Sequence, residues 1–307
     1  AEVCRAVILE DGRINDYIVE NVSQEKIKGN IYLGVINRVE PAIEAAFVDF
    51  GGNKYGFLPF KDVLKESYVD TGEKKARVRI QDVLVRGQEI LVQVAKESRD
   101  AKGPSLTNSI SLPGRFLVLM SGSHASAVSR KIEDEDERKA MRKVLDSINL
   151  PEGFGFILRT AGMGKRKEEI KRDIAYLIRL WKMIETRIKN VGSPCQLYNE
   201  SDLLVRTIRD VLRPNIGEII VDSESAYERI ASFLKIAAPR SSRKVILYRE
   251  PSPLFHAFDI ERQIEEVHSR EVDLPSGGRL VIDQTEALVA IDVNSGKSRG
   301  ARNSEAN

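Results

Sequence analysis

Apolar and polar residues alternate in short stretches through the first hundred positions, and this two-residue period predicts β-strands. Residues 4–9 and 14–20 are expected to form a hairpin, because Asp11-Gly12 between them is typical of a tight turn. Further strands are expected at residues 31–36, 45–50, 55–59 and 89–95. Several short strands in close succession indicate a small barrel. The charged stretch 65–82 is expected to be a mobile loop within it.

After residue 110, apolar residues also recur every three or four positions, and this spacing predicts helices. A strand at 115–120, a helix at 133–148 and a strand at 154–160 precede a long helix expected at 166–189. Apolar residues recur along this helix at intervals of four and three, as on a core-facing surface, at Ile170, Ile174, Leu177, Trp181, Ile184 and Ile188.

Helices and strands alternate from residue 202 onward. Together with the strand-rich first part, this pattern predicts a multidomain α+β protein. The expected helices are 202–212, 225–234 and 259–268, and the expected strands are 218–222, 244–248, 279–283 and 287–294.

Composition narrows the classes of protein. The 307 residues suggest about two domains, and a hydrophobic content of 42% is enough for sizeable cores. The net charge of +2 means that nucleic-acid binding has to be argued from local patches. Cys4 and Cys195 stand far apart and predict neither a zinc site nor a disulfide framework, which favours the cytoplasm. There is no signal peptide, and no apolar run approaches the roughly 18 residues of a membrane span.

The last apolar run, 287–294, is expected to be a buried strand that ends in functional groups. Side chains alternate along a strand, so Asp292 and Asn294 leave the same face. A carboxylate beside an amide oxygen suits a hard cation such as Mg²⁺. The alternative is a plain strand end, since Asp and Asn commonly terminate strands.

An aromatic segment in the barrel region suits nucleic acid. Tyr55 and Phe57 are expected on one strand face, with Leu58 towards the core and Lys54 and Lys61 nearby. Bases stack on exposed rings beside positive charge without demands on sequence. The alternative is that Phe57 packs inside the barrel.

A third candidate site lies where strand 154–160 meets a glycine-containing loop. Arg159 offers a guanidinium fork, Thr160 offers a hydroxyl, and the loop offers backbone N–H groups, which together can hold a phosphate. The alternative is an ordinary strand-to-helix turn. No GxGxxG, Walker A or nucleophile-elbow motif is present, so a metabolic α/β enzyme has little support.

Five segments, in order along the chain, resemble the catalytic region of the RNase E/G family of bacterial endoribonucleases. They are residues 29–34, 45–49, 55–59, 158–162 and 290–296. The resemblance implies a split RNase H-like fold at 1–27 and 205–268, with an inserted OB-fold RNA-binding barrel at 28–110. It also implies a 5′-sensor subdomain at 111–204 and the start of a DNase I-like domain at 269–307.

The resemblance implies roles for individual residues in RNA binding. Phe57 would stack on an RNA base, Tyr68 would be the second aromatic, and Lys102 would contact the RNA. Arg159 and Thr160 would sense a 5′-monophosphate.

Val128 and Arg130 would face the sensor of the 5′-monophosphate. Asp292 and Asn294 would be catalytic residues and would supply one half of a Mg²⁺ site. The second magnesium-binding aspartate and the cysteines of a Zn²⁺ link would lie beyond residue 307.

The family's function is then expected here. It is Mg²⁺-dependent cleavage of single-stranded A/U-rich RNA, with preference for 5′-monophosphorylated ends, in mRNA decay and rRNA and tRNA processing. The full-length protein would be a homo-oligomer, a dimer or tetramer, with RNA-decay partners if a C-terminal tail exists. Its expected location is the cytoplasm, with membrane association as an alternative. The alternative is a non-catalytic RNA-binding protein, or an inactive fragment, that uses only the barrel and the phosphate pocket.

Overall fold

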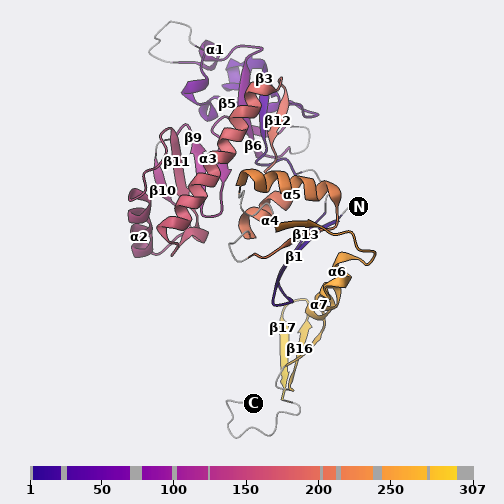
Figure 1. Cartoon of the computed structure of the whole chain (residues 1–307). Coiled ribbons are helices and arrows are strands. Elements are labelled where there is room, and N and C mark those ends of the chain that lie inside the picture. Colours follow the sequence, from indigo (N-terminus) through magenta and orange to yellow (C-terminus); the bar gives the residue numbers. More distant parts are fainter. Residues whose placement is uncertain are drawn as a thin grey trace. The chain divides into compact units, whose positions relative to one another are not determined.

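The computed structural model describes residues 3–21, 26–69, 78–98, 102–123, 125–200, 203–211, 216–237, 244–274 and 277–295 (Figure 1). The chain separates into two compact units. The first contains residues 1–4 and 20–247, and the second contains residues 5–19 and 248–307.

A closed five-stranded barrel occupies the start of the first unit. Its strands pair in the order β3, β4, β5, β7 and β6, and β6 closes onto β3. They are β3 (Ile31–Glu40), β4 (Ala45–Asp49), β5 (Gly56–Pro59), β6 (Glu89–Lys96) and β7 (Ser105–Thr107). The interior is apolar, with Ile36, Val48, Leu58 and Val92 fully buried. The expected OB-like barrel is therefore confirmed.

The stretch expected to be a mobile loop is partly ordered. A 3₁₀ turn, η3, covers Lys65–Ser67 and a short helix, α1, covers Ile80–Val83. Ile80 is 1% exposed because it packs into the barrel core together with Val83. The expectation is wrong for these two segments, since the charged composition around them hid two core residues. Residues 70–77 lie outside the described ranges.

A four-stranded sheet follows the barrel, in the order β10, β11, β9, β8. Its strands are β8 (Ser111–Pro113), β9 (Leu117–Ser121), β10 (Ser126–Val128) and β11 (Phe154–Leu158). Helix α2 (Glu135–Asp146) and the long helix α3 (Lys167–Asn190) accompany this sheet (Figure 1). The predicted seam of α3 is confirmed, with Ile170, Leu177 and Ile184 fully buried.

The chain returns to the barrel after α3. Strand β12 (Cys195–Tyr198) pairs antiparallel with β3. The rest of the first unit is α4 (Leu203–Val211), β13 (Ile219–Val221), α5 (Glu224–Ala237) and β14 (Val245–Leu247), with β13 and β14 parallel. Phe233 and Leu234 of α5 share one core with α3. Within the described ranges, none of the helices combines the length and the apolar character that a bilayer crossing requires.

The second unit begins with the predicted hairpin. Strands β1 (Val3–Glu10) and β2 (Arg13–Asn21) meet at Asp11 and Gly12, both with positive φ, as a two-residue hairpin turn requires. Helices α6 (Leu254–Ala257) and α7 (Ile260–Val267) follow later in the chain. Gln263 of α7 ties the hairpin down, since its side chain accepts from Ile14 N and donates to Gly12 O, each at 2.9 Å.

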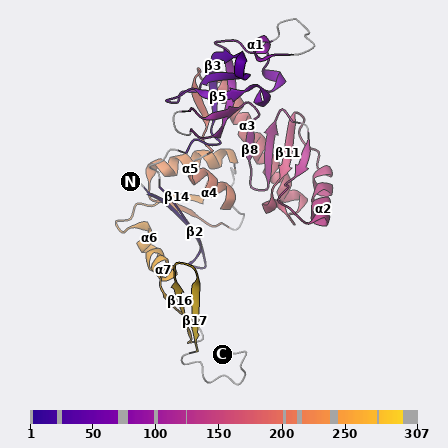
Figure 2. The ribbon, with the colours of Figure 1, turned by 180° about the vertical axis from the view of Figure 1, so that it is seen from behind.

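A three-stranded antiparallel sheet extends from α7 (Figure 2). It consists of β15 (Glu271–Asp273), β16 (Arg279–Gln284) and β17 (Val289–Asn294). The expectation that the last strand is buried is wrong for the described residues, since Val289, Ile291 and Val293 are 56–66% exposed. All six residues of β17 are exposed.

Candidate functional site

Two phenylalanines on neighbouring barrel strands form an aromatic pair. Phe47 of β4 lies opposite Phe57 of β5, and their rings meet edge to face with centroids 6.0 Å apart. Both rings are partly exposed, whereas the adjacent Val48 and Leu58 are fully buried. The prediction that Phe57 and Leu58 occupy opposite faces of the strand is confirmed.

The pair belongs to a row that crosses the outer face of the barrel. Arg38 of β3 pairs with Phe47 and holds its guanidinium 4.9 Å from the centre of that ring. On the other side Phe57 pairs with Ser105 of β7, which pairs with Lys96 of β6. Arg38 also lies 3.5 Å from the carboxylate of Glu40. Exposed cations therefore flank two aromatic rings, an arrangement that suits stacked bases and their phosphates. We call Arg38, Phe47, Phe57, Ser105 and Lys96 the aromatic row.

Lys102 lies beside this row. Pro104 accepts a hydrogen bond from Phe57 N at 2.8 Å, and a Cβ on Gly103 would come within 2.0 Å of the carbonyl oxygen of Tyr55. Only glycine allows this close approach, which sets the exposed Lys102 next to Tyr55. Lys102 thus lies two residues before the carbonyl group that accepts from Phe57 N.

Tyr68 has a different environment. Its ring stacks on Phe60 with centroids 5.9 Å apart, and it packs against the buried residues of the barrel. Burial raises the pKa of the Tyr68 hydroxyl. The role of Tyr68 as the second aromatic, which the resemblance implies, stays a prediction. Phe47 was not among the residues that the sequence singled out. The position of Phe47, one residue before the core residue Val48, was the available signal.

The predicted phosphate-sensing residues come together at one end of the four-stranded sheet. Strands β10 and β11 run parallel, with Val128 opposite Leu158 and Ser129 N donating to Leu158 O at 2.8 Å. Arg159 and Thr160 follow Leu158 in the chain, so they leave the sheet beside Val128. Arg130 follows Ser129 and is exposed at the same end of the sheet.

Arg159 is anchored at one corner of its guanidinium group. Its Nη1 donates to the carbonyl oxygens of Gly114 and Arg115 and lies 3.8 Å from Oδ1 of Asp210. Its Nε and Nη2 donate to no acceptor in the part of the chain that the structure describes, and the same holds for the exposed Thr160 hydroxyl. An open guanidinium edge beside a hydroxyl matches the oxygens of a terminal phosphate.

A buried carboxylate holds the loop that anchors Arg159. Asp173 of α3 accepts from the backbone N–H groups of Arg115 at 3.0 Å and of Phe116 and Leu117 at 2.8 Å each. Burial raises the pKa of Asp173, while these donors and the charge of Arg159 oppose that shift. Sequence reasoning missed Asp173. An aspartate between the core residues Ile170 and Ile174 of the predicted seam was the signal.

The glycine loop after Arg159 serves packing. A Cβ on Gly162 would lie 2.8 Å from Cδ1 of Leu158, so glycine is needed for a close turn. At the start of α3, Glu169 accepts from Arg166 N at 3.1 Å. Beside this turn, the side chains of Arg159 and Thr160 offer groups that a phosphate can contact.

The predicted metal-binding pair lies on one face of β17. Asn294 Nδ2 donates to Oδ2 of Asp292 at 3.0 Å, so the prediction that both side chains leave the same face is confirmed. Both are exposed. On the neighbouring strand Arg279 pairs with Glu271 and Asp273, which reduces its repulsion of a cation.

The oxygen donors of this pair fit Mg²⁺, which binds through one or two carboxylates and keeps several waters. Asp292 supplies the charged oxygen, and Asn294 orients it through their hydrogen bond. No cluster of three or more His, Cys, Asp or Glu side chains suited to a metal occurs in the described ranges. The donor chemistry of a carboxylate beside an amide oxygen is what fits a magnesium ion held mostly by water.

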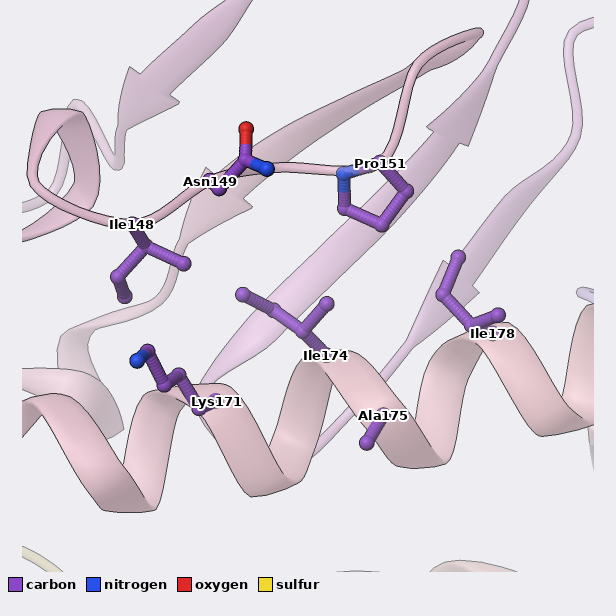
Figure 3. A pocket seen from close by; sticks show the side chains of 7 residues that line it. All are labelled: Ile148, Asn149, Pro151, Lys171, Ile174, Ala175 and Ile178. Carbon is purple, nitrogen blue, oxygen red and sulfur yellow. The ribbon is translucent and has the colours of Figure 1, made fainter.

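An open groove of about 450 Å³ lies between α3 and the segment that leads into β11 (Figure 3). Ile174 and Ile178 of α3 face Pro151 across it, and Lys171 and Asn149 add polar groups. None of the predicted RNA, phosphate or metal residues lines this groove.

Comparison with known proteins first identifies the class of the barrel. Residues 25–109 match the S1 RNA binding domain, which covers all five barrel strands. Residues 111–307 match the Ribonuclease E/G family. The chain belongs to the Ribonuclease E/G family, and the resemblance noted in the sequence is confirmed.

Individual relatives extend along almost the whole chain. Ribonuclease E of Haemophilus influenzae is 45% identical over 298 residues, which cover 97% of this chain and 32% of the relative. Ribonuclease E of Escherichia coli is 43% identical over 302 residues, 97% of this chain and 28% of the relative. Ribonuclease G of Escherichia coli is 38% identical over 302 residues, which cover 97% of this chain and 62% of the relative. The chain thus spans about a third of the length of these ribonuclease E relatives.

Proposed function

We propose that the whole protein is a Mg²⁺-dependent endoribonuclease that cleaves single-stranded, A/U-rich RNA and favours 5′-monophosphorylated ends. The observation that carries the proposal is the aromatic row, an exposed stacking platform flanked by cations on a barrel of the S1 class. Decay of mRNA and processing of rRNA and tRNA are the expected cellular roles. The test is cleavage of a fluorescent single-stranded oligonucleotide by the full-length protein, with Mg²⁺ and then with excess chelator.

The same proposal extends to the domain architecture. Residues 1–27 and 205–268 would be the two parts of an RNase H-like fold, and residues 269–307 would begin a DNase I-like domain. Residues 28–110 and 111–204 would be the inserted barrel and the 5′-sensor subdomain. The parallel pair β13–β14 with α5 supports the first assignment, and the antiparallel sheet bearing Asp292 supports the second.

RNA is expected to cross the barrel along the aromatic row. Replacing Phe57 by alanine should weaken binding of a single-stranded oligonucleotide by about 1–3 kcal/mol, the worth of one base–aromatic stack. Replacing Phe47 should have a similar effect, and the double variant should lose less than the sum, because the two rings contact each other. Fluorescence anisotropy measures these affinities.

The matched control is Phe258→Ala, which removes a ring that is 40% exposed in the second unit. It should leave RNA affinity unchanged. A large loss of thermal stability in the Phe57 variant with unchanged RNA affinity would show that the ring serves only the packing of the barrel.

The 5′ end of the RNA is proposed to bind at Arg159 and Thr160. Arg159→Ala should abolish the preference for 5′-monophosphorylated over 5′-hydroxyl RNA, because the open guanidinium edge is lost. Arg159→Lys should restore it only in part, since an ammonium keeps the charge without the fork. The measurement is the cleavage rate of matched oligonucleotides that differ only at the 5′ group. Equal slowing of both substrates by Arg159→Ala would refute the sensor.

Asp292 and Asn294 would hold the magnesium ion. When bound, the ion would lower the pKa of a water and neutralise charge on the phosphate. The protein's own contribution is to fix the carboxylate, since Asn294 donates to Asp292. Hydrolysis is expected to leave a 3′-hydroxyl and a 5′-phosphate.

A second candidate function is RNA binding without cleavage. The completeness of the aromatic row within the described residues favours it, because stacking and phosphate contacts need no metal. Under this alternative the full-length protein binds the RNA but does not cleave it in the presence of Mg²⁺.

Assembly and location are also proposals. We expect a homo-oligomer, a dimer or tetramer, with a Zn²⁺ link and RNA-decay partners contributed by regions that the longer relatives have. The cytoplasm is the expected compartment, with membrane association of the full-length protein as an alternative. Gel filtration with light scattering of the full-length protein tests the oligomer.

A further inference from the structure

An acidic residue faces the proposed phosphate pocket. Asp210 lies near the end of α4, and its Oδ1 is 3.8 Å from Nη1 of Arg159. The same carboxylate is held by the guanidinium of Arg209, with Nε at 3.1 Å from Oδ1 and Nη2 at 3.5 Å from Oδ2. Asp210 therefore stands between two arginines.

A buried network fixes this arrangement. The side chain of Arg209 is 6% exposed and forms an ion pair with Glu200, whose own side chain is 11% exposed. Arg209 also donates to Pro113 O at 3.3 Å, and Tyr198 donates to Glu200 at 3.0 Å. The confined Arg209 therefore holds the carboxylate of Asp210 next to Arg159.

The charge of Asp210 then acts on whatever Arg159 binds. A terminal phosphate carries about −1.5 to −2 charges at neutral pH. Placed on the open edge of Arg159, it gains the attraction of the guanidinium and also meets the fixed negative charge of Asp210. The attraction by Arg159 and the repulsion by Asp210 therefore oppose each other.

We propose that Asp210 is an affinity-setting residue of the phosphate pocket, a built-in anion that limits how tightly Arg159 holds an RNA end. This inference rests on the proposed function of Arg159. The pocket is thereby suited to a transient grip, which lets a cleaved RNA leave. Because Arg159 and Asp210 are 35% and 49% exposed, solvent screens the interaction and the effect is moderate.

The test uses Asp210→Asn, which removes the charge and keeps the shape and one acceptor oxygen. Affinity of the full-length protein for a 5′-monophosphorylated oligonucleotide should rise about threefold to fivefold, as expected for one partly exposed charge. Affinity for the 5′-hydroxyl oligonucleotide should change less than twofold. The gain should shrink as salt rises and should vanish in an Arg159→Ala background.

The two variants test the role of Arg159 in phosphate binding separately from the role of Asp210 in limiting it. If Arg159→Ala leaves discrimination between the two 5′ ends intact, the pocket is elsewhere and the proposed function of Arg159 fails. If Arg159→Ala removes discrimination but Asp210→Asn leaves affinity unchanged or weakens it, Asp210 does not limit phosphate binding and this inference is overturned. The control Asp146→Asn neutralises an exposed carboxylate at the end of α2 and should change neither affinity.

Discussion

Replacing Asp292 with asparagine is expected to slow RNA cleavage by the full-length protein at least a hundredfold and to leave RNA affinity within about twofold. The variant keeps the size of the side chain but loses the only full negative charge of the pair that we assign to Mg²⁺. A hundredfold loss corresponds to about 2.7 kcal/mol of transition-state stabilisation, within the several kcal/mol that a bound metal supplies. Single-turnover cleavage rates and fluorescence anisotropy measure the two quantities.

The matched control for this prediction is Asp283→Asn on the neighbouring strand. Asp283 is also exposed on this sheet, but Arg270 occupies its carboxylate through two hydrogen bonds. Arg270 also holds the pKa of Asp283 below its usual value. This variant should cleave at nearly the wild-type rate. An Asp292 variant that keeps more than about a tenth of the wild-type rate would refute the metal assignment.

Replacing Asp173 with alanine is expected to lower the free energy of unfolding by about 3 kcal/mol or more. The change leaves the backbone N–H groups of Arg115, Phe116 and Leu117 without their acceptor in a buried site, and each such loss costs roughly 1–3 kcal/mol. The melting temperature should fall by roughly 6–12 °C for a unit of this size. Differential scanning calorimetry of the purified protein measures both.

Two companions sharpen the stability test. Asp173→Asn keeps one acceptor oxygen and should lose about half as much stability, whereas Asp146→Ala removes an exposed carboxylate and should change stability by less than about 0.5 kcal/mol. The Asp173 variants that remain folded should also lose discrimination of the 5′ phosphate, because Gly114 and Arg115 no longer hold Arg159 in place. A loss of less than about 1 kcal/mol in Asp173→Ala would mean that water replaces the carboxylate.

Local patterns predicted the secondary structure well, since the physics that forms it is local. The turn at Asp11-Gly12 and the buried seam of α3 follow from backbone preferences and side-chain periods that span a few residues. The same period set Phe57 outside and Leu58 inside the barrel. It also set Asp292 and Asn294 on one face of their strand.

Burial and partnership were harder to predict, because they depend on what lies across the fold. Strand β17 is apolar enough to be buried, but all six of its residues are exposed. Ile80 sits among charges and is nevertheless a core residue. Phe47 entered the candidate site only through the strand register that sets it opposite Phe57.

The sequence by itself determined the family, the strands and helices, and the residue types that suit RNA, phosphate and metal. The tertiary structure alone decided which of these residues meet. Arg159 and Asp210 are 51 positions apart in the chain, and a helix and a loop had to pack before their charges faced each other. Asp173 reaches across 56 to 58 residues to hold the loop beneath Arg159. Such contacts arise from the packing of whole helices and strands. The periodicity of side chains along the sequence does not predict them.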